Sequence, residues 1–141
     1  MKTTRFLIAL AIASLSGTGT ASAADIKVIA NPSVTATAIS ADEIKGVFLA
    51  TKTSLSNGSH VEPVLEKSGA VHEGFLKAYL GKTDAALETY YRSLVFTGKG
   101  SMPKTLSSEA EVVSYVAKTK GAIGYVSSGA STPGVKTLEV K

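Results

Sequence analysis

Short runs of β-branched and apolar residues alternate with amphipathic segments along most of this chain, and this alternation restricts the folds open to it. Short apolar runs suit buried strands, whereas apolar positions three and four residues apart suit helices that cover a sheet. Strands separated by helices usually run parallel and are joined by right-handed connections. The sequence therefore predicts an α/β fold, with a mixed, mostly parallel sheet flanked by helices.

Four segments are expected to form strands: residues 26–30, 61–65, 122–126 and 135–140. The first of them is closed by Asn31-Pro32-Ser33, a turn-forming sequence. Pro63 has no N–H group to donate, so we expect it at a sheet edge or at an irregular point of a ladder.

Four helices are expected, and capping residues mark where most of them begin. Ser40 and Glu43 have the spacing of a capping box, as do Ser108 and Glu111. Another helix is expected to start at Thr83 or Asp84 and to end near Gly98. The remaining one follows Ser68-Gly69, stops at Gly81, and carries the periodic apolar set Val71, Phe75, Leu76, Tyr79 and Leu80.

The first 23 residues have the layout of a secretory signal peptide. A basic start is followed by an apolar run at residues 6–13 and by Ala21-Ser22-Ala23. The run is shorter than the ~20 apolar residues that a membrane-spanning helix requires, so a retained anchor is the less favoured alternative. We expect cleavage after Ala23, a periplasmic or secreted location, and a single domain over residues 24–141.

Composition excludes several classes of protein. The chain has no cysteine, which rules out disulfide frameworks, thiolate metal sites and a lipid anchor on cysteine. Without Lys2 and Arg5, 13 Lys/Arg remain against 11 Asp/Glu, and the lysines are not clustered along the sequence. Nucleic-acid binding is therefore not expected.

One sequence has the chemistry of a ligand site. Lys67-Ser68-Gly69 lies between an expected strand and an expected helix, where unpaired N–H groups and the positive end of the helix dipole attract anions. Ser68 adds a hydroxyl group, Gly69 allows close approach of the backbone, and Lys67 adds a positive charge. The alternative is that Ser68 is only the N-cap of the helix.

The sequence offers little for metal binding or catalysis. His60 and His72 are twelve residues apart, and with Glu62 and Glu73 they could hold zinc, but they lack the spacing of a helical ligand pair. A secreted hydrolase would have to use one of these histidines without a recognisable nucleophile motif. We therefore expect no metal, no cofactor and no enzymatic activity.

Several motifs together resemble the periplasmic phosphate-binding proteins of ABC importers. They are Asn31-Pro32-Ser33, residues 43–49, residues 75–81 and, most specifically, residues 120–126, Lys-Gly-Ala-Ile-Gly-Tyr-Val. The resemblance is to small single-lobe members of that superfamily. It implies a fold similar to one lobe of a type 2 periplasmic binding protein.

The resemblance also implies a phosphate site at the start of the central helix. In the full-length family this helix begins Ser-Gly-Thr, an arginine precedes it, and the anion lies between two lobes. Here Ser68 and Gly69 match, Ala70 replaces the threonine, and Lys67 and His72 are the available substitutes for the arginine. The expected oxyanion-binding residues are Lys67, Ser68, Gly69, Ala70, His72, Asn31 and Ser33.

The leading hypothesis is therefore a secreted solute-binding protein for phosphate or a similar oxyanion. Its expected partners are an ABC permease or another envelope protein, and a homodimer could rebuild a two-sided cleft. The alternative is a protein-interaction module that keeps the lobe fold without a ligand.

Overall fold

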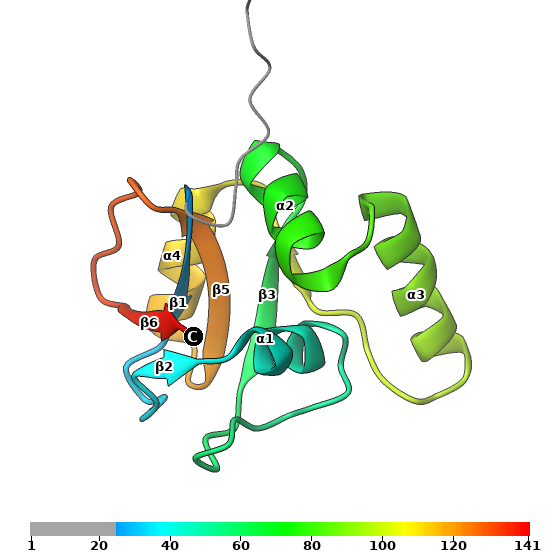
Figure 1. Ribbon diagram of the computed structural model, residues 1–141, viewed down its shortest axis with the longest axis horizontal. Helices are drawn as coiled ribbons and strands as arrows, with labels where there is room; N and C mark the ends of the chain where they lie inside the picture. Colours follow the sequence, from blue (N-terminus) through cyan, green and yellow to red (C-terminus); the bar gives the residue numbers. More distant parts are fainter. Residues whose placement is uncertain (1–24) are drawn as a thin grey trace, which may run out of the picture.

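The computed structural model describes residues 25–141, and a six-stranded sheet runs through it in the order β2-β6-β1-β5-β3-β4 (Figure 1). The strands are β1 (Ile26–Ala30), β2 (Ala38–Ile39), β3 (Glu62–Glu66), β4 (Lys104–Leu106), β5 (Ala122–Ser127) and β6 (Lys136–Val140). β1 is antiparallel to its neighbours β5 and β6, whereas the pairs β2–β6, β3–β5 and β3–β4 are parallel. Only β1 is reversed among these strands, which confirms the expected mixed, mostly parallel sheet.

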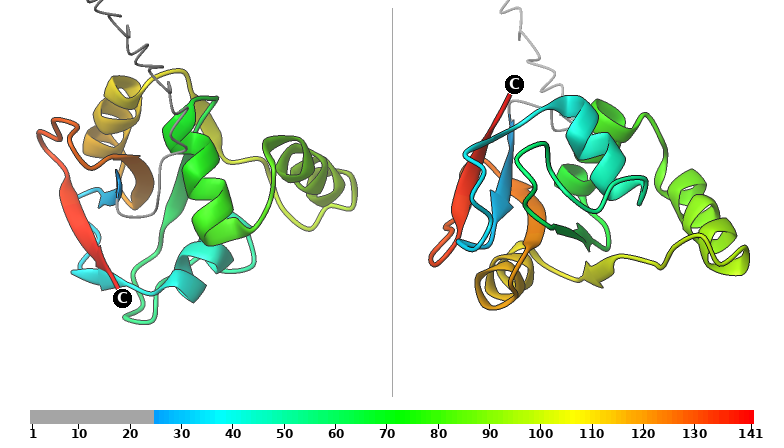
Figure 2. Two further views of the ribbon diagram at one scale, coloured as in Figure 1. Left: turned by 45° about the horizontal axis from the view of Figure 1, so that its top comes forward. Right: turned by 90° about the horizontal axis from the view of Figure 1, so that it is seen from below.

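Helices cover both faces of the sheet. The elements are α1 (Ala41–Phe48), α2 (Ala70–Phe75), the π-helical turn η2 (Leu76–Leu80) that continues α2, α3 (Asp84–Phe96) and α4 (Glu109–Lys118). α4 packs on one face through Val112, Val113 and Val116, and α1 and α2 cover the other through Phe48 and Phe75. α3 lies at the outside of the molecule, away from the sheet (Figures 1 and 2). The chain therefore has the layered α/β architecture that the sequence predicts.

The expected helix starts are confirmed, with one difference in detail. The hydroxyl of Ser40 accepts a hydrogen bond from the N–H of Glu43, whose carboxylate accepts one from the N–H of Ser40, which completes the capping box of α1. The hydroxyl of Ser108 caps α4 in the same way, but the carboxylate of Glu111 accepts from the N–H of Ser107 instead of Ser108. In the expected capping box of α4, the hydrogen bond to the Ser108 hydroxyl is therefore formed and the one from the Ser108 N–H to Glu111 is not.

β3 is an internal strand, so of the two positions expected for Pro63 the sheet edge is wrong and the irregular point of a ladder is confirmed. The N–H of Glu62 donates to Gly121 on the β5 side, so the nitrogen of Pro63 faces the β4 side. The ladder with β4 begins only at Val64. The proline therefore lies where no hydrogen bond to β4 is required, and this explains why the strand tolerates it.

Gly124 allows α4 to approach β5 closely. A methyl group placed on Gly124 would lie 2.9 Å from Cγ1 of Val112 and 3.5 Å from Cγ2 of Val116. Both valines are buried against the sheet. The glycine inside the Ala-Ile-Gly-Tyr-Val sequence therefore sets the distance between the helix and the sheet.

We expect Gly124→Ala to lower the free energy of unfolding by about 1–3 kcal/mol, because the added methyl group overpacks this contact. Urea unfolding of the purified protein measures the change. Gly129→Ala is the matched control, since a methyl group there would meet nothing within 4 Å. Equal stabilities of the two variants would contradict the packing role of Gly124.

Glu66, the last residue of β3, carries a carboxyl group that is unfavourably buried. The residue is 5% exposed, and its Oε1 atom has no hydrogen-bond partner among the described residues. Burial, and to a lesser extent the nearby carboxylate of Glu109, raises the pKa of Glu66 to about 7 from 4.5. Glu109 itself accepts hydrogen bonds from the N–H and hydroxyl groups of Ser127. The charged form of Glu66 therefore destabilises the folded state.

The raised pKa predicts a specific pH dependence of stability. Between the unfolded and folded pKa values the folded state binds more protons than the unfolded state, so stability falls as the pH rises through this window. Glu66→Gln removes this pH dependence. As the pH rises from about 5 to about 8, we expect the free energy of unfolding of the variant to increase by about 2 kcal/mol relative to that of the wild type. Urea unfolding at both pH values measures it, with the exposed Glu139→Gln as control. Parallel pH profiles of Glu66→Gln and wild type would contradict the prediction.

Candidate functional site

The structure places Lys67, Ser68 and Gly69 on the connection from β3 to α2, and Ala70 at the first position of α2. This connection lies at one end of the sheet (Figure 1). All four residues are exposed. The N–H of Lys67 donates to the carbonyl of Leu106, which ties the connection to β4. This connection is therefore anchored at its base and open to solvent at its tip.

The start of α2 has no side-chain cap. Gly69 is the N-cap residue, with a φ of 114° that favours glycine, and no side chain bonds the helix start. The alternative in which Ser68 is the N-cap is therefore wrong, and the Ser68 hydroxyl forms no hydrogen bond with the described residues. The helix starts with the bond from the N–H of Glu73 to the carbonyl of Gly69, so the N–H groups of the preceding turn have no partner within the helix. These groups can serve an anion or water.

His72 is almost fully buried, although it lines the same cavity as Lys67. It is 2% exposed, and both ring nitrogens are engaged: Nδ1 with the hydroxyl of Tyr125, and Nε2 with Oδ1 of Asp84 at 2.9 Å. Burial raises the pKa of Tyr125, so its hydroxyl stays protonated. That hydroxyl accepts from the N–H of Glu66 at 3.1 Å and forms a hydrogen bond with Nδ1 of His72, while Nε2 of the same ring meets Asp84.

A periodic pattern in the sequence could have shown that His72 is buried. It lies three residues before Phe75 and four before Leu76, on the same helical face, and both of these side chains are buried. Its partners Asp84 and Tyr125 carry no comparable signal, because they come from distant segments. The sequence analysis therefore missed this hydrogen-bonded chain.

Asn31 and Ser33 lie at the opposite end of the sheet from Ser68. Ala30 pairs with Ile123 near the start of β5, and Pro63, near the start of β3, pairs with the same residue. Ser68 follows the end of β3, so roughly 17 Å of strand separates the two places.

Asn31 and Ser33 also have structural partners of their own. The amide of Asn31 donates to the carbonyls of Val116 and Ala117, and its oxygen accepts from the N–H of Ser33. The hydroxyl of Ser33 accepts from the N–H of Gly121. These two residues hold a turn beneath α4 and do not join the Ser68 site.

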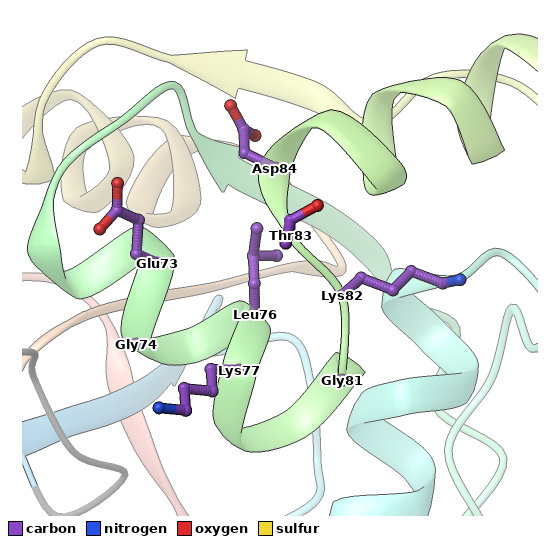
Figure 3. A pocket seen from close by; sticks show the side chains of 8 residues that line it. All are labelled: Glu73, Gly74, Leu76, Lys77, Gly81, Lys82, Thr83 and Asp84. Atoms are coloured by element: carbon purple, nitrogen blue, oxygen red, sulfur yellow. The ribbon is translucent and has the colours of Figure 1, made fainter.

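The hollow next to Lys67 has the wrong charge for an anion. This cavity, of about 280 Å³, lies between the end of β3 and α3, and Glu66, Asp84 and Glu88 line it together with Lys67. A larger cavity, of about 550 Å³, lies between α2 and the start of α3 (Figure 3). Its two lysines, Lys77 and Lys82, extend in opposite directions, so they do not converge on one ligand.

Other chemistries find little support in the described residues. No group of three or more His, Asp or Glu side chains in residues 25–141 could hold a metal ion. The pair of Asp84 and His72 faces the phenol of Tyr125 inside the core rather than a serine hydroxyl in a cleft. Over the same residues, no helix has the length and apolar character needed to span a membrane.

The sequence matches no protein-family model and no curated protein sequence. Solved structures do match. An ABC-type phosphate transport receptor from Vibrio cholerae superimposes with a TM-score of 0.63 at 14% identity, covering 82% of this chain and 46% of the receptor. PstS from Borrelia burgdorferi gives 0.62 at 14% identity, with 83% of this chain and 47% of PstS covered.

A third matching structure contains phosphate. It is a protein described as a phosphate ABC transporter substrate-binding protein with bound phosphate, from Clostridium perfringens, with a TM-score of 0.64 and 16% identity. The match covers 82% of this chain and 44% of that protein. This chain therefore spans less than half of the length of these three proteins, and its fold is similar to the part of each that it covers.

Proposed function

We propose that this protein is an exported solute-binding protein that binds phosphate or a similar oxyanion at Lys67, Ser68, Gly69 and Ala70. The observation that carries the proposal is the uncapped start of α2, where backbone N–H groups, a free hydroxyl and a lysine lie together in solvent. Two of the matching structures are described as a phosphate transport receptor and as a phosphate ABC transporter substrate-binding protein with bound phosphate. An ABC permease or another envelope protein is the expected recipient of the ligand.

The geometry supports modest affinity. Lys67 supplies a point charge rather than the bidentate fork of an arginine, and Ala70 supplies no hydroxyl. An exposed charge attracts the anion through water and is screened by salt. A second copy of the chain would cover the open side of the site, which is the physical reason to expect a homodimer.

Export is proposed from the sequence of the first 23 residues. The basic start, the apolar run and Ala21-Ser22-Ala23 lie outside the described residues, so the proposal rests on the sequence pattern alone. Cleavage after Ala23 would release the domain into the periplasm. Neither a metal ion nor a cofactor is required for the proposed function.

A protein-interaction module is the second candidate, and exposed apolar residues on and after α3 favour it. Phe96 is 92% exposed, Val95 51% and Met102 50%. Exposed apolar side chains grouped on one element often mark contact sites for other proteins. If the protein is an interaction module, the fold serves as a scaffold for partner binding and the start of α2 binds only water.

Titration calorimetry of residues 24–141 with inorganic phosphate tests the leading proposal. We expect saturable binding that weakens as sodium chloride is added, because the site is exposed. Ser68→Ala removes a hydroxyl donor and should reduce affinity about three- to tenfold. Lys67→Gln should reduce both the affinity and its dependence on salt.

Ser114→Ala is the matched control, because Ser114 is an exposed serine on α4, away from the site. It should leave the affinity unchanged. If the folded protein does not bind phosphate at millimolar concentration, the proposed uptake function is wrong and the interaction module becomes the favoured function. Unchanged affinity in Ser68→Ala would show that phosphate binds elsewhere.

A further inference from the structure

A polar cavity of about 440 Å³ lies at the end of β3 opposite the Ser68 site. Its walls come from the end of α1, the start of β3, residues 99–104 and Tyr115 of α4. Glu62, the first residue of β3, lines it, whereas Lys67 follows the last residue of that strand. The cavity and the proposed phosphate site are therefore separate places on the molecule.

Basic side chains from three segments meet at this cavity. Lys52 follows α1, Lys99 follows α3, and Lys104 begins β4. His60 also lines the cavity, and Glu62 is the sole acidic residue among the described residues that line it. The lysines are spread along the sequence, so the positive charge of this cavity arises only when the chain folds.

The folded chain restrains two of these lysines. The stem of Lys52 lies across Gly46, because a methyl group placed on Gly46 would come within 2.9 Å of its Cδ atom. The ammonium group of Lys104 lies 5.8 Å from the ring centroid of Tyr115, within the range of a cation–π contact. Restrained lysines lose less conformational freedom when they bind an anion than free ones do.

Lys52 has one further charged neighbour outside the cavity. The pKa of Glu43 is lowered, chiefly by its hydrogen bond with the Ser56 side chain, and to a smaller degree by the charge of Lys52. Part of the Lys52 charge is therefore offset by Glu43. With Glu62 included, the cavity still holds more positive than negative charge, which suits a dianion better than a single carboxylate.

We infer that this cavity is a second anion-binding site, which takes a phosphoryl group that is either free in solution or part of a lipid headgroup. Lysine ammonium groups bind phosphoryl oxygens as point charges with several donors. The half-exposed side chain of Met102 also lines the cavity, so an apolar part of the same ligand would find a contact. This site goes beyond the proposed function, because it uses neither Ser68 nor the start of α2.

Two probes distinguish the sources of the phosphoryl group. Inorganic phosphate is titrated while NMR follows the His60 ring and the backbone amides of residues 99–102 and 104. Vesicles of phosphatidylglycerol with phosphatidylcholine are tested by co-sedimentation against vesicles of phosphatidylcholine alone. The combined variant Lys52→Gln/Lys99→Gln/Lys104→Gln should weaken the response to the effective probe at least about tenfold.

Lys118→Gln/Lys120→Gln/Lys141→Gln is the matched control, since it removes the same charge from exposed residues that do not line the cavity. It should change binding less than about twofold. Ser68→Ala should leave the His60 response intact, which separates this site from the proposed function. An effect of phosphate on His60 identifies a free anion, and binding of anionic vesicles alone identifies a headgroup. Equal losses in both combined variants, or no response to either probe, would overturn the inference.

Discussion

The side chain of Tyr125 is the contact on which the arrangement of β3, β5 and α2 depends. Its ring stacks on Phe75 of α2 and meets Phe48 of α1 edge to face. Its hydroxyl joins the backbone of β3 at Glu66 to His72 of α2. One residue of the central strand therefore links the sheet to both helices on that face. Because the tyrosine is fully buried, removal of its hydroxyl would take a hydrogen-bond partner from the N–H of Glu66 and from Nδ1 of His72 in the core.

This buried arrangement also determines which residues are free to bind. His72 is buried and forms hydrogen bonds with Tyr125 and Asp84. Among the described residues, the exposed connection after β3 therefore offers a ligand Lys67, the Ser68 hydroxyl and the backbone N–H groups. The same chain of hydrogen bonds tethers Asp84, the first residue of α3, to the body of the protein. The base of the proposed anion site and the outlying helix are therefore held by one polar network.

Periodicity and capping chemistry predicted most of the elements. Ser40 with Glu43, Thr83 and Ser108 begin helices as expected, and Gly81 ends η2 in the left-handed conformation. The strands β2 and β4 were not predicted, because two or three residues carry no measurable alternation. Pro63 was expected at an edge or at an irregular point of a ladder, and the sequence could not distinguish the two because it does not show that the β4 ladder begins one residue later.

The sequence by itself determined most of the elements, their layering and the segment Lys67–Ala70, because these depend on neighbouring residues and on the helical and strand periods. Only the tertiary structure decided which of the candidate site residues lie close together in space. Asn31 and Ser33 lie at one end of the sheet and Ser68 at the other, since β1 runs opposite to β3. The lysines of the second cavity meet for the same reason: strand order and direction, which no local pattern encodes, bring distant segments together.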